Sequence, residues 1–247
     1  MLRLLYLHKM KKIESIKELR KICQPEYEEV KHNPLYRIYR RFFRIFSIYI
    51  TRTLLSFNVS ANLVSIFGLI SGVIGSLFLY FGEFLIGSII LQLWLLVDTL
   101  DGEVARYYAR KKPKNYLVKG EFLDLNFHHL IHFFVFLGLS LGLYNLTKDV
   151  KTIYLGMGAL SALLLNELID LNKIKLFFYY NIKFKKAGQK RGLLKKLMFI
   201  YTFPSIANLI LIFSIFNKVD FVIYFYGITF PIMFLIKFYI NNFIRKW

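Results

Sequence analysis

The sequence predicts an all-α integral membrane protein with six transmembrane helices, preceded by a cytoplasmic or interfacial amphipathic helix. Three observations lead to this prediction. The 247 residues are 56% hydrophobic and 18% aromatic, which is more apolar surface than one soluble domain of this size can bury. Apolar runs of the roughly 20 residues needed to cross a bilayer recur along the chain. Basic residues are concentrated in alternate connections between these runs, which is typical of membrane topology.

Six segments are predicted to span the membrane: 62–81, 84–106, 120–143, 152–172, 197–217 and 221–240. If both termini are cytoplasmic, only Lys148, Lys151 and Lys218 of the 34 lysines and arginines lie in outer turns. Cytoplasmic loops carry the excess of basic residues, so this orientation is predicted. A missed or invented helix would move every later loop to the other side and destroy the pattern.

The first 57 residues divide into two parts. Residues 1–32 mix charges of both signs around Pro25 and predict a cytoplasmic N-terminal cap. Residues 33–57 interleave arginines with tyrosine, phenylalanine and isoleucine, the composition of an amphipathic helix in the headgroup plane. The alternative is that this segment begins the first spanning helix, although five arginines are costly in hydrocarbon. Residues 58–247 then form the six-helix transmembrane domain.

The net charge of +19 limits the classes of partner. A nucleic-acid-binding protein would need a basic groove on a water-exposed fold, whereas these charges lie between apolar runs. Anionic lipid headgroups and phosphorylated substrates are therefore the expected partners, and nucleic acid is not. Cys23 is the single cysteine, which excludes an internal disulfide and a cysteine-based metal site.

Two aspartates interrupt the second predicted span in the stretch LLVDTLDGEVARYYARKK, residues 95–112. Asp98 lies roughly 21 Å along the helix from its outer end, still inside the bilayer. Asp98, Asp101 and Ala105 follow one another at i, i+3 and i+7, so they share one stripe of the helix. Acids inside a membrane usually face the bundle or a wet cavity and mark a site. The alternative is a solvated helix end.

The third predicted span supplies further polar groups, Glu121, Asp124 and His128. If these two helices pack antiparallel, Asp101 and Asp124 meet in one layer, and Asp98 and His128 meet in a second layer about one turn deeper. Carboxylates gathered in a low-dielectric site repel one another unless cations are present. Oxygen-rich clusters suit Mg²⁺ or Mn²⁺ together with phosphates. The sequence therefore predicts a divalent-metal site for a pyrophosphate, open to the cytoplasm.

These residues resemble the signature of the CDP-alcohol phosphotransferases, or CDP-alcohol phosphatidyltransferases, D-x2-D-G-x2-A-R-x8-G-x3-D-x3-D. The chain has DTLDGEVAR (98–106) and then GEFLDLNFH (120–128). The stretch NVSANLVSIFGL (58–69) is similar to the start of that family's first spanning helix. The architecture of an interfacial helix and six spans also matches, so the resemblance covers about residues 33–247 and makes 58–247 the catalytic domain.

The resemblance implies a transferase of phospholipid or related phosphodiester synthesis. Such an enzyme moves a substituted phosphate group from a CDP-linked donor to an alcohol hydroxyl and releases CMP. A lipid donor such as CDP-diacylglycerol is favoured because the site lies within the bilayer at the inner leaflet. The resemblance further implies two divalent cations, a homodimer and the cell membrane as location. Carried over to this sequence, its metal ligands are Asp98, Asp101, Asp124 and His128, with Asp124 and His128 also catalytic. Its nucleotide-binding residues are Asn62, Asp98, Gly102, Ala105, Arg106 and Gly120.

The sequence departs from the family pattern in two places. Arg106 and Gly120 are separated by 13 residues where the pattern has eight, and the extra length falls in a cytoplasmic turn, where insertions cost little. The last motif aspartate is His128 here. Three interpretations stay open: His128 is the working base or a softer ligand, a nearby acid such as Glu121 or Glu167 compensates, or activity is lost.

Two other functions remain as alternatives. A catalytically impaired member of the family would bind a CDP-linked ligand or a partner through the same cavity. A small transporter would use the buried acids as a cation site, which does not explain the Asp-Gly-x-x-Ala-Arg run. Two further histidines, His129 and His132, are expected to be packing residues, and the acidic pair Glu167 and Asp170 is most simply a helix-end topology signal.

Overall fold

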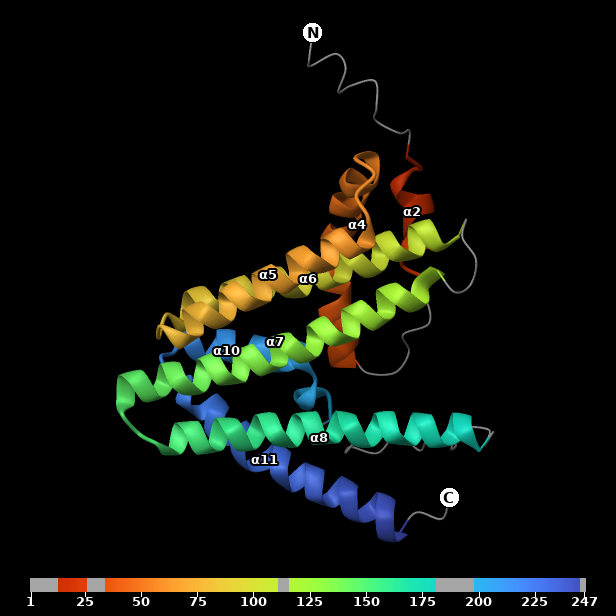
Figure 1. The fold of residues 1–247 in the computed structure, drawn as a ribbon. Coiled ribbons are helices and arrows are strands. Elements are labelled where there is room, and N and C mark those ends of the chain that lie inside the picture. Colours follow the sequence, from red (N-terminus) through yellow and green to blue (C-terminus); the bar gives the residue numbers. More distant parts are fainter. Residues whose placement is uncertain (1–12, 26–33, 111–115, 181–197, 245–247) are drawn as a thin grey trace. The chain divides into compact units, whose positions relative to one another are not determined.

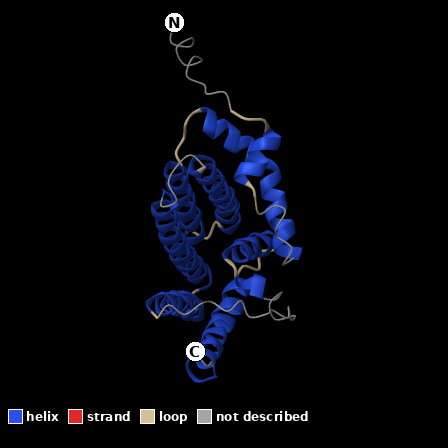
Figure 2. Cartoon of the chain, turned by 90° about the vertical axis from the view of Figure 1, so that its right-hand side faces the viewer, coloured by secondary structure: helices blue, strands red, loops and turns tan. Residues whose placement is uncertain are grey.

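The computed structural model of the chain describes residues 13–25, 34–110, 116–180 and 198–244. Parts of the predicted N-terminal cap, residue 33 of the predicted interfacial helix and residue 197 of the fifth predicted span lie outside these residues. The described residues are helices joined by short loops and contain no strand (Figure 1 and Figure 2). They divide into two compact units, and each is described by itself. Unit 1 comprises residues 1–72 and 90–128, and unit 2 comprises residues 73–89 and 129–247.

Five described helices are long and apolar enough to cross a membrane. They are α5 (Ala61–Tyr80), α6 (Phe84–Ala109), α7 (Tyr116–Thr147), α8 (Lys151–Tyr179) and α11 (Asp220–Tyr239). Each corresponds to one of the predicted spans, and the prediction of an all-α membrane protein is confirmed.

The fifth predicted span, 197–217, begins later than expected. The described part of it holds a short 3-10 helix, η1 (Met198–Tyr201), and then α10 (Phe203–Ile215). Pro204 lies in the first turn of α10. Proline fits a first helical turn but cannot donate the hydrogen bond that a continuous helix would need there. With 13 residues, α10 is roughly 20 Å long, shorter than the roughly 30 Å hydrocarbon core.

Left-handed residues end several helices at the predicted turns. Asn58, Gly82 and Asn217 have φ values of 54°, 83° and 52°. At Gly82 the backbone N–H bonds to Leu79 O, and the N–H of Glu83 bonds to Phe78 O. This is the Schellman arrangement, which satisfies the last carbonyls of the helix. The turn between α5 and α6 is therefore specified locally.

The core of unit 1 is built by α2 (Ile16–Cys23), α4 (Pro34–Ser56), α5 and α6. Ser15 caps α2, and the Glu18 side chain accepts from the Ser15 backbone in a capping box. The buried core residues are Leu19, Cys23, Ile48, Leu55, Val64, Leu100, Val104 and Tyr107. The N-terminal segment is thus packed against the helix that carries Asp98 and Asp101.

A buried carboxylate, Glu103, joins three segments of unit 1. Its side chain has no exposed surface, and it accepts hydrogen bonds from Gln24 Nε2, Ser47 Oγ and Thr51 Oγ1, each 2.6 Å long. Buried charges are tolerated only when they are well hydrogen-bonded. These three bonds satisfy both carboxylate oxygens and position α4 against α6.

A second polar contact holds the start of α2 near the end of α6. Tyr107 Oη donates to Glu14 at 2.7 Å, and Arg110 donates to the other carboxylate oxygen of Glu14. Burial of Glu14 acts to raise its pKa, but the hydrogen bonds from Tyr107 and Arg110 outweigh burial and lower the pKa to about 2. The ionised form of Glu14 is therefore the one that this contact stabilises.

On α4, aromatic side chains are exposed and some polar side chains are buried, the opposite of the arrangement in a soluble protein. Phe42, Phe46 and Tyr49 are more than half exposed, whereas Ser47 and Thr51 are fully buried on Glu103. An exposed aromatic face suits contact with lipid. This pattern supports the predicted interfacial helix, which stays a prediction.

Glycines bring the helices of unit 2 into backbone contact. A Cβ added at Gly138 would lie 2.3 Å from Ser76 O, and one at Gly142 would lie 1.9 Å from Leu79 O. These positions are four residues apart on α7, so they face the same side of that helix. The sequence GLSLG (138–142) is therefore a small-xxx-small motif, which lets membrane helices approach closely.

Candidate active site

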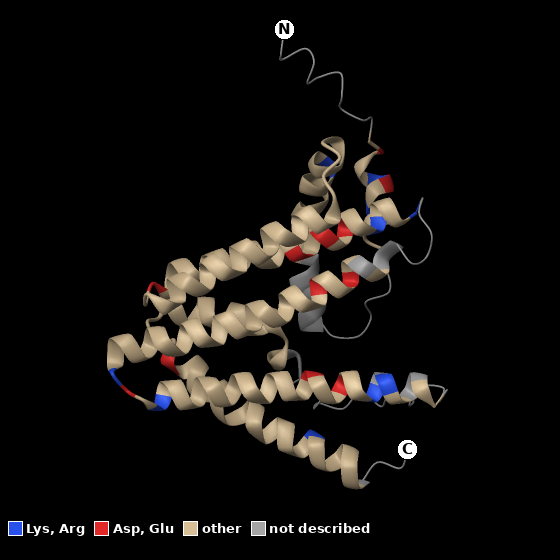
Figure 3. Ribbon diagram, in the orientation of Figure 1, with Lys and Arg blue, Asp and Glu red and all other residues tan. Residues whose placement is uncertain are grey.

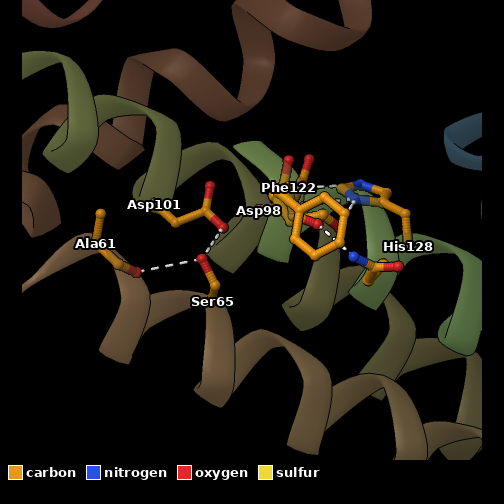
Figure 4. Close-up of polar contacts among 8 residues, drawn as sticks. Ala61, Ser65, Asp98, Asp101, Phe122 and His128 are labelled. Atoms are coloured by element: carbon orange, nitrogen blue, oxygen red, sulfur yellow. Dashed lines mark hydrogen bonds and ion pairs between the residues drawn. The ribbon is translucent and has the colours of Figure 1, made fainter. Parts of the chain in front are cut away.

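Asp101 lies at the wall of unit 1 where α5 and α6 meet. Its side chain is 8% exposed, and Oδ2 accepts a hydrogen bond of 2.8 Å from Ser65 Oγ (Figure 4). Ser65 also donates to Ala61 O, 3.2 Å away. Ser65 follows Asn62 by three residues on α5, so both face Asp101 and the cavity described below. The carboxylate of Asp101 is thereby held in one orientation.

His128 lies between two of the predicted acids. Its Nε2 is 2.9 Å from Asp98 Oδ1, and its Nδ1 is 3.3 Å from Asp124 Oδ1 (Figure 4). Nδ1 is also 2.9 Å from Asp124 O. The i, i+4 spacing on α7 places His128 directly over Asp124. The edge of the ring packs against Trp94 with 5.4 Å between centroids.

These residues have the chemistry of a divalent-cation site. Ligand atoms of Asp98, Asp124 and His128 all lie within 4.8 Å of one another. Acidic residues of α6 and of α7 lie on stretches of these two helices that face each other (Figure 3). Two carboxylates and an imidazole offer oxygen and nitrogen ligands that suit Mn²⁺ and, less well, Mg²⁺. The residues therefore fit the divalent ions expected from the sequence.

A cavity of about 380 Å³ opens beside these acids within unit 1. Its lining comes from α5, α6 and α7 and includes Ser60, Ala61, Asn62, Ser65, Asp101, Gly102, Ala105, Arg106, Gly120, Glu121 and Asp124. Five of the six predicted nucleotide-binding residues line it. The sixth, Asp98, is paired with His128 and is not among the lining residues.

Small residues keep this cavity open next to a guanidinium. A Cβ added at Gly102 would lie 3.0 Å from Arg106 Nη1, whereas one at Gly120 would lie 3.7 Å from Asn62 Oδ1. Arg106 Nε donates to Cys23 O at 2.5 Å. A fixed guanidinium at the wall of a cavity is suited to a phosphate group.

Sequence reasoning missed two residues of the site. Ser65 holds Asp101 by a hydrogen bond, and Trp94 packs against the ring of His128. A signal for Ser65 was available, since it stands three residues after Asn62 and so shares its helix face. Nothing in the sequence distinguishes Trp94 from other apolar residues of its helix.

The two proposed compensating acids lie in different surroundings. Glu121 is exposed and lines the cavity with Asp124. Glu167 on α8 instead contacts two histidines of α7. Its Oε2 is 2.6 Å from His129 Nδ1, and its Oε1 is 3.5 Å from His132 Nδ1. Asp170 pairs with Lys173 and Lys237.

The fold is similar to that of a known membrane enzyme. The crystal structure of Mycobacterium tuberculosis phosphatidylinositol phosphate synthase with CDP-DAG bound superposes with a TM-score of 0.59. The match covers 82% of this chain and 98% of that chain at 16% sequence identity. No protein-family model matches the chain, and no curated protein sequence matches it. The fold agrees with the architecture that the motif resemblance implies.

Proposed function

We propose that the chain is a CDP-alcohol phosphotransferase. It takes a substituted phosphate group from a CDP-linked lipid, with CDP-diacylglycerol as the first candidate, and transfers it to an alcohol hydroxyl with release of CMP. One observation carries the proposal. The residues of the Asp-Gly-x-x-Ala-Arg motif, Asn62 and Gly120 line one cavity that also contains the carboxylates of Asp101 and Asp124. The fold shared with an enzyme that binds CDP-DAG supports it.

The donor's pyrophosphate would lie against the acids and Arg106. Asp98, Asp101 and Asp124 would hold two divalent ions, Mg²⁺ or Mn²⁺. When bound, such ions neutralise charge on the phosphoryl oxygens and orient the leaving group. Arg106 adds a fixed positive charge, and Gly102 leaves room at the cavity wall. The cytidine would contact Asn62, Ala105 and Gly120.

His128 would take the proton of the attacking alcohol. Its Nδ1 faces Asp124 O at 2.9 Å, and a donated hydrogen bond there leaves Nε2 as the proton-accepting atom. Once Nε2 has taken the proton, it would donate a hydrogen bond to Asp98 Oδ1, 2.9 Å away. The hydroxyl would attack the phosphate, the bond from phosphate to the CMP oxygen would break, and the proton would leave through Nε2.

The test is CMP release by the purified full chain. The protein is incubated in detergent or vesicles with CDP-diacylglycerol, a panel of polyols and hydroxy acids, and Mg²⁺ or Mn²⁺. Release of CMP that depends on both substrates is expected. Absence of CMP release with every donor and acceptor would contradict the proposal.

The metal requirement has its own test. Asp101→Asn or Asp124→Asn should abolish CMP release while the protein keeps its elution volume and helicity, because each removes a negative ligand. A chelator should do the same reversibly. Full turnover in the presence of the chelator would show that the reaction does not require a metal ion.

A binding protein without turnover is the second candidate. It is favoured by one feature of the site, since both ring nitrogens of His128 face oxygens of Asp98 and Asp124. Such a protein would bind CMP or CDP with a divalent cation in calorimetry and release no CMP. A small transporter would not bind the nucleotide.

A further inference from the structure

A second group of metal-ligating side chains lies in unit 2. His129 and His132 are three residues apart on α7, so they project from one face of that helix. Glu167 reaches them from α8. Potential ligand atoms of the three residues all lie within 4.8 Å of one another. From the sequence alone, His129 and His132 are expected to be packing residues, and Glu167 a helix-end topology signal or a compensating acid.

The contacts in this group are close but incompletely hydrogen-bonded. Glu167 Oε2 and His129 Nδ1 are 2.6 Å apart, and both atoms are buried. Within the described residues, neither makes a hydrogen bond of acceptable geometry. Buried polar atoms without such a bond are costly and require an explanation. A cation coordinated by both atoms would provide one.

The positions of these atoms suit a tetrahedral ion. Ligands at zinc distances of about 2.0–2.1 Å lie roughly 3.3 Å from one another. Glu167 offers a different oxygen to each histidine, since Oε2 is 2.6 Å from His129 Nδ1 and Oε1 is 3.5 Å from His132 Nδ1. One potential ligand atom from each residue lies within 4.8 Å of the others, and coordination would draw them to about 3.3 Å. The His132 ring is also fixed by stacking on Phe203, with 4.3 Å between centroids.

The group also has room for a fourth ligand. His132 and Glu167 line a cavity of about 500 Å³ in unit 2. A zinc site with three protein ligands keeps its remaining position for water or another small ligand. The cavity supplies both that position and a path for the ion.

We propose that His129, His132 and Glu167 form a binding site for a divalent transition metal, with Zn²⁺ as the preferred ion. Two imidazoles and one carboxylate favour zinc over magnesium, which prefers oxygen ligands. The bound ion joins α7 to α8 within unit 2 and leaves one coordination position facing the cavity. This site is separate in its residues from Asp98, Asp101 and Asp124, and it does not depend on the proposed transferase activity.

The experiment uses tag-free full-length protein in detergent. The substitutions Asp98→Asn, Asp101→Asn and Asp124→Asn are combined to remove the carboxylates of the first cluster. This background protein is stripped with a chelator and titrated with Zn²⁺, or with Co²⁺ as a spectroscopic probe. One equivalent should bind, and Co²⁺ should show the intense visible bands of tetrahedral coordination.

Removing one ligand should weaken the binding strongly. In the same background, His132→Gln or Glu167→Gln should raise the Kd for Co²⁺ on the order of 100-fold or more, since even loss of an outer-shell partner costs 10- to 100-fold. The matched control is Asp170→Asn, which removes a carboxylate one turn further along α8 and should leave metal binding unchanged. Zn²⁺ should raise the Tm of the background protein and of the control, but not of Glu167→Gln.

Two results would overturn the proposal. One is a background protein that binds no stoichiometric Zn²⁺ or Co²⁺. The other is a His132→Gln protein that binds Co²⁺ as tightly as its background. If the ligand variants do not fold, X-ray absorption at the zinc edge of the background protein decides, because it must show two imidazole ligands. A failure of CMP release would leave these outcomes unaffected.

Discussion

His128 is the residue on which the chemistry of the candidate site depends most. It stands where the family motif has its last aspartate, and it contacts both Asp98 and Asp124. The two ring nitrogens have different neighbours: Nδ1 lies 2.9 Å from Asp124 O, and Nε2 lies 2.9 Å from Asp98 Oδ1.

Replacing His128 tests its role as proton acceptor. His128→Ala should lower kcat for CMP release on the order of 10² to 10⁴, the usual size of general-base catalysis, while CDP-donor binding survives. His128→Asp restores the motif and should retain substantial activity with a stronger preference for Mg²⁺. Steady-state kinetics and nucleotide binding by calorimetry measure both effects. Wild-type rates in His128→Ala would direct attention to Glu121 as the base.

Glu103 shows that an acid inside the motif can have a structural role. It lies two residues after Asp101, yet it faces the opposite side of α6 and binds Gln24, Ser47 and Thr51. Sequence reasoning did not select it. The spacing of Glu103 within the motif gives no sign of a structural role, and its hydrogen-bond partners are distant in the chain.

Removing the Glu103 carboxylate should destabilise unit 1. Glu103→Ala leaves three buried donors without their acceptor, and each such group costs about 1–3 kcal/mol. Thermal unfolding in detergent should therefore begin at a clearly lower temperature. The control is Glu83→Ala, whose side chain is exposed and whose loss should change stability by less than about 0.5 kcal/mol. Equal Tm values for the two variants would show that the buried network contributes little.

At the scale of elements, helix lengths and ends were largely predictable. The apolar runs and the residues Asn58, Gly82 and Asn217 place the ends of α4, α5 and α10 within a few residues. Two helices differ more from the prediction: α10 starts later, with Pro204 in its first turn, and α8 continues to Tyr179, beyond the predicted end at residue 172. The close packing of α7 on the α5 residues of unit 2 depends on Gly138 and Gly142. Their role could not be predicted, because it depends on the backbone of α5 that they contact.

The contact at Gly142 can be tested with one methyl group. The Cβ of Gly142→Ala would lie 1.9 Å from the carbonyl oxygen of Leu79, a backbone atom that can move only with its helix. Overpacking of this kind costs about 1–3 kcal/mol, measured as a loss of thermal stability in detergent. Gly158→Ala is the control, since its nearest neighbour, Gly227 O, is 3.9 Å away. An unchanged Tm in Gly142→Ala would mean that α5 and α7 can move apart at little energetic cost.

At the scale of the whole molecule, the predicted membrane topology is based on where the lysines and arginines lie along the chain. Its basic residues follow the positive-inside rule if both termini are cytoplasmic. That orientation, the homodimer and the location in the cell membrane stay predictions. The described helices and the similar fold support an integral membrane protein.

Reporter tags can determine the orientation. Tags inserted after Lys112 and after Lys186 should be protected from reagents outside intact cells, and a tag after Lys148 should be accessible. The reason is that the first two positions lie in sequence segments rich in lysine and arginine, whereas the third lies between two spans in a segment with few basic residues. Protease protection or cysteine labelling measures the pattern. Any other combination would contradict six spans with both ends inside.

The sequence by itself determined that the chain is a membrane protein, where its long apolar helices lie, and which acids and which histidine are candidates for the active site. These properties follow from local composition and from spacing along a helix, since an i, i+3 or i, i+4 interval already places Asp98 with Asp101 and Asp124 with His128. The tertiary structure decided which distant groups meet. Ser65 on Asp101, Trp94 on His128, the donors of Glu103 and the approach of Glu167 to two histidines each join residues more than 30 positions apart. Such contacts depend on how helices pack, and no periodicity along one chain segment encodes them.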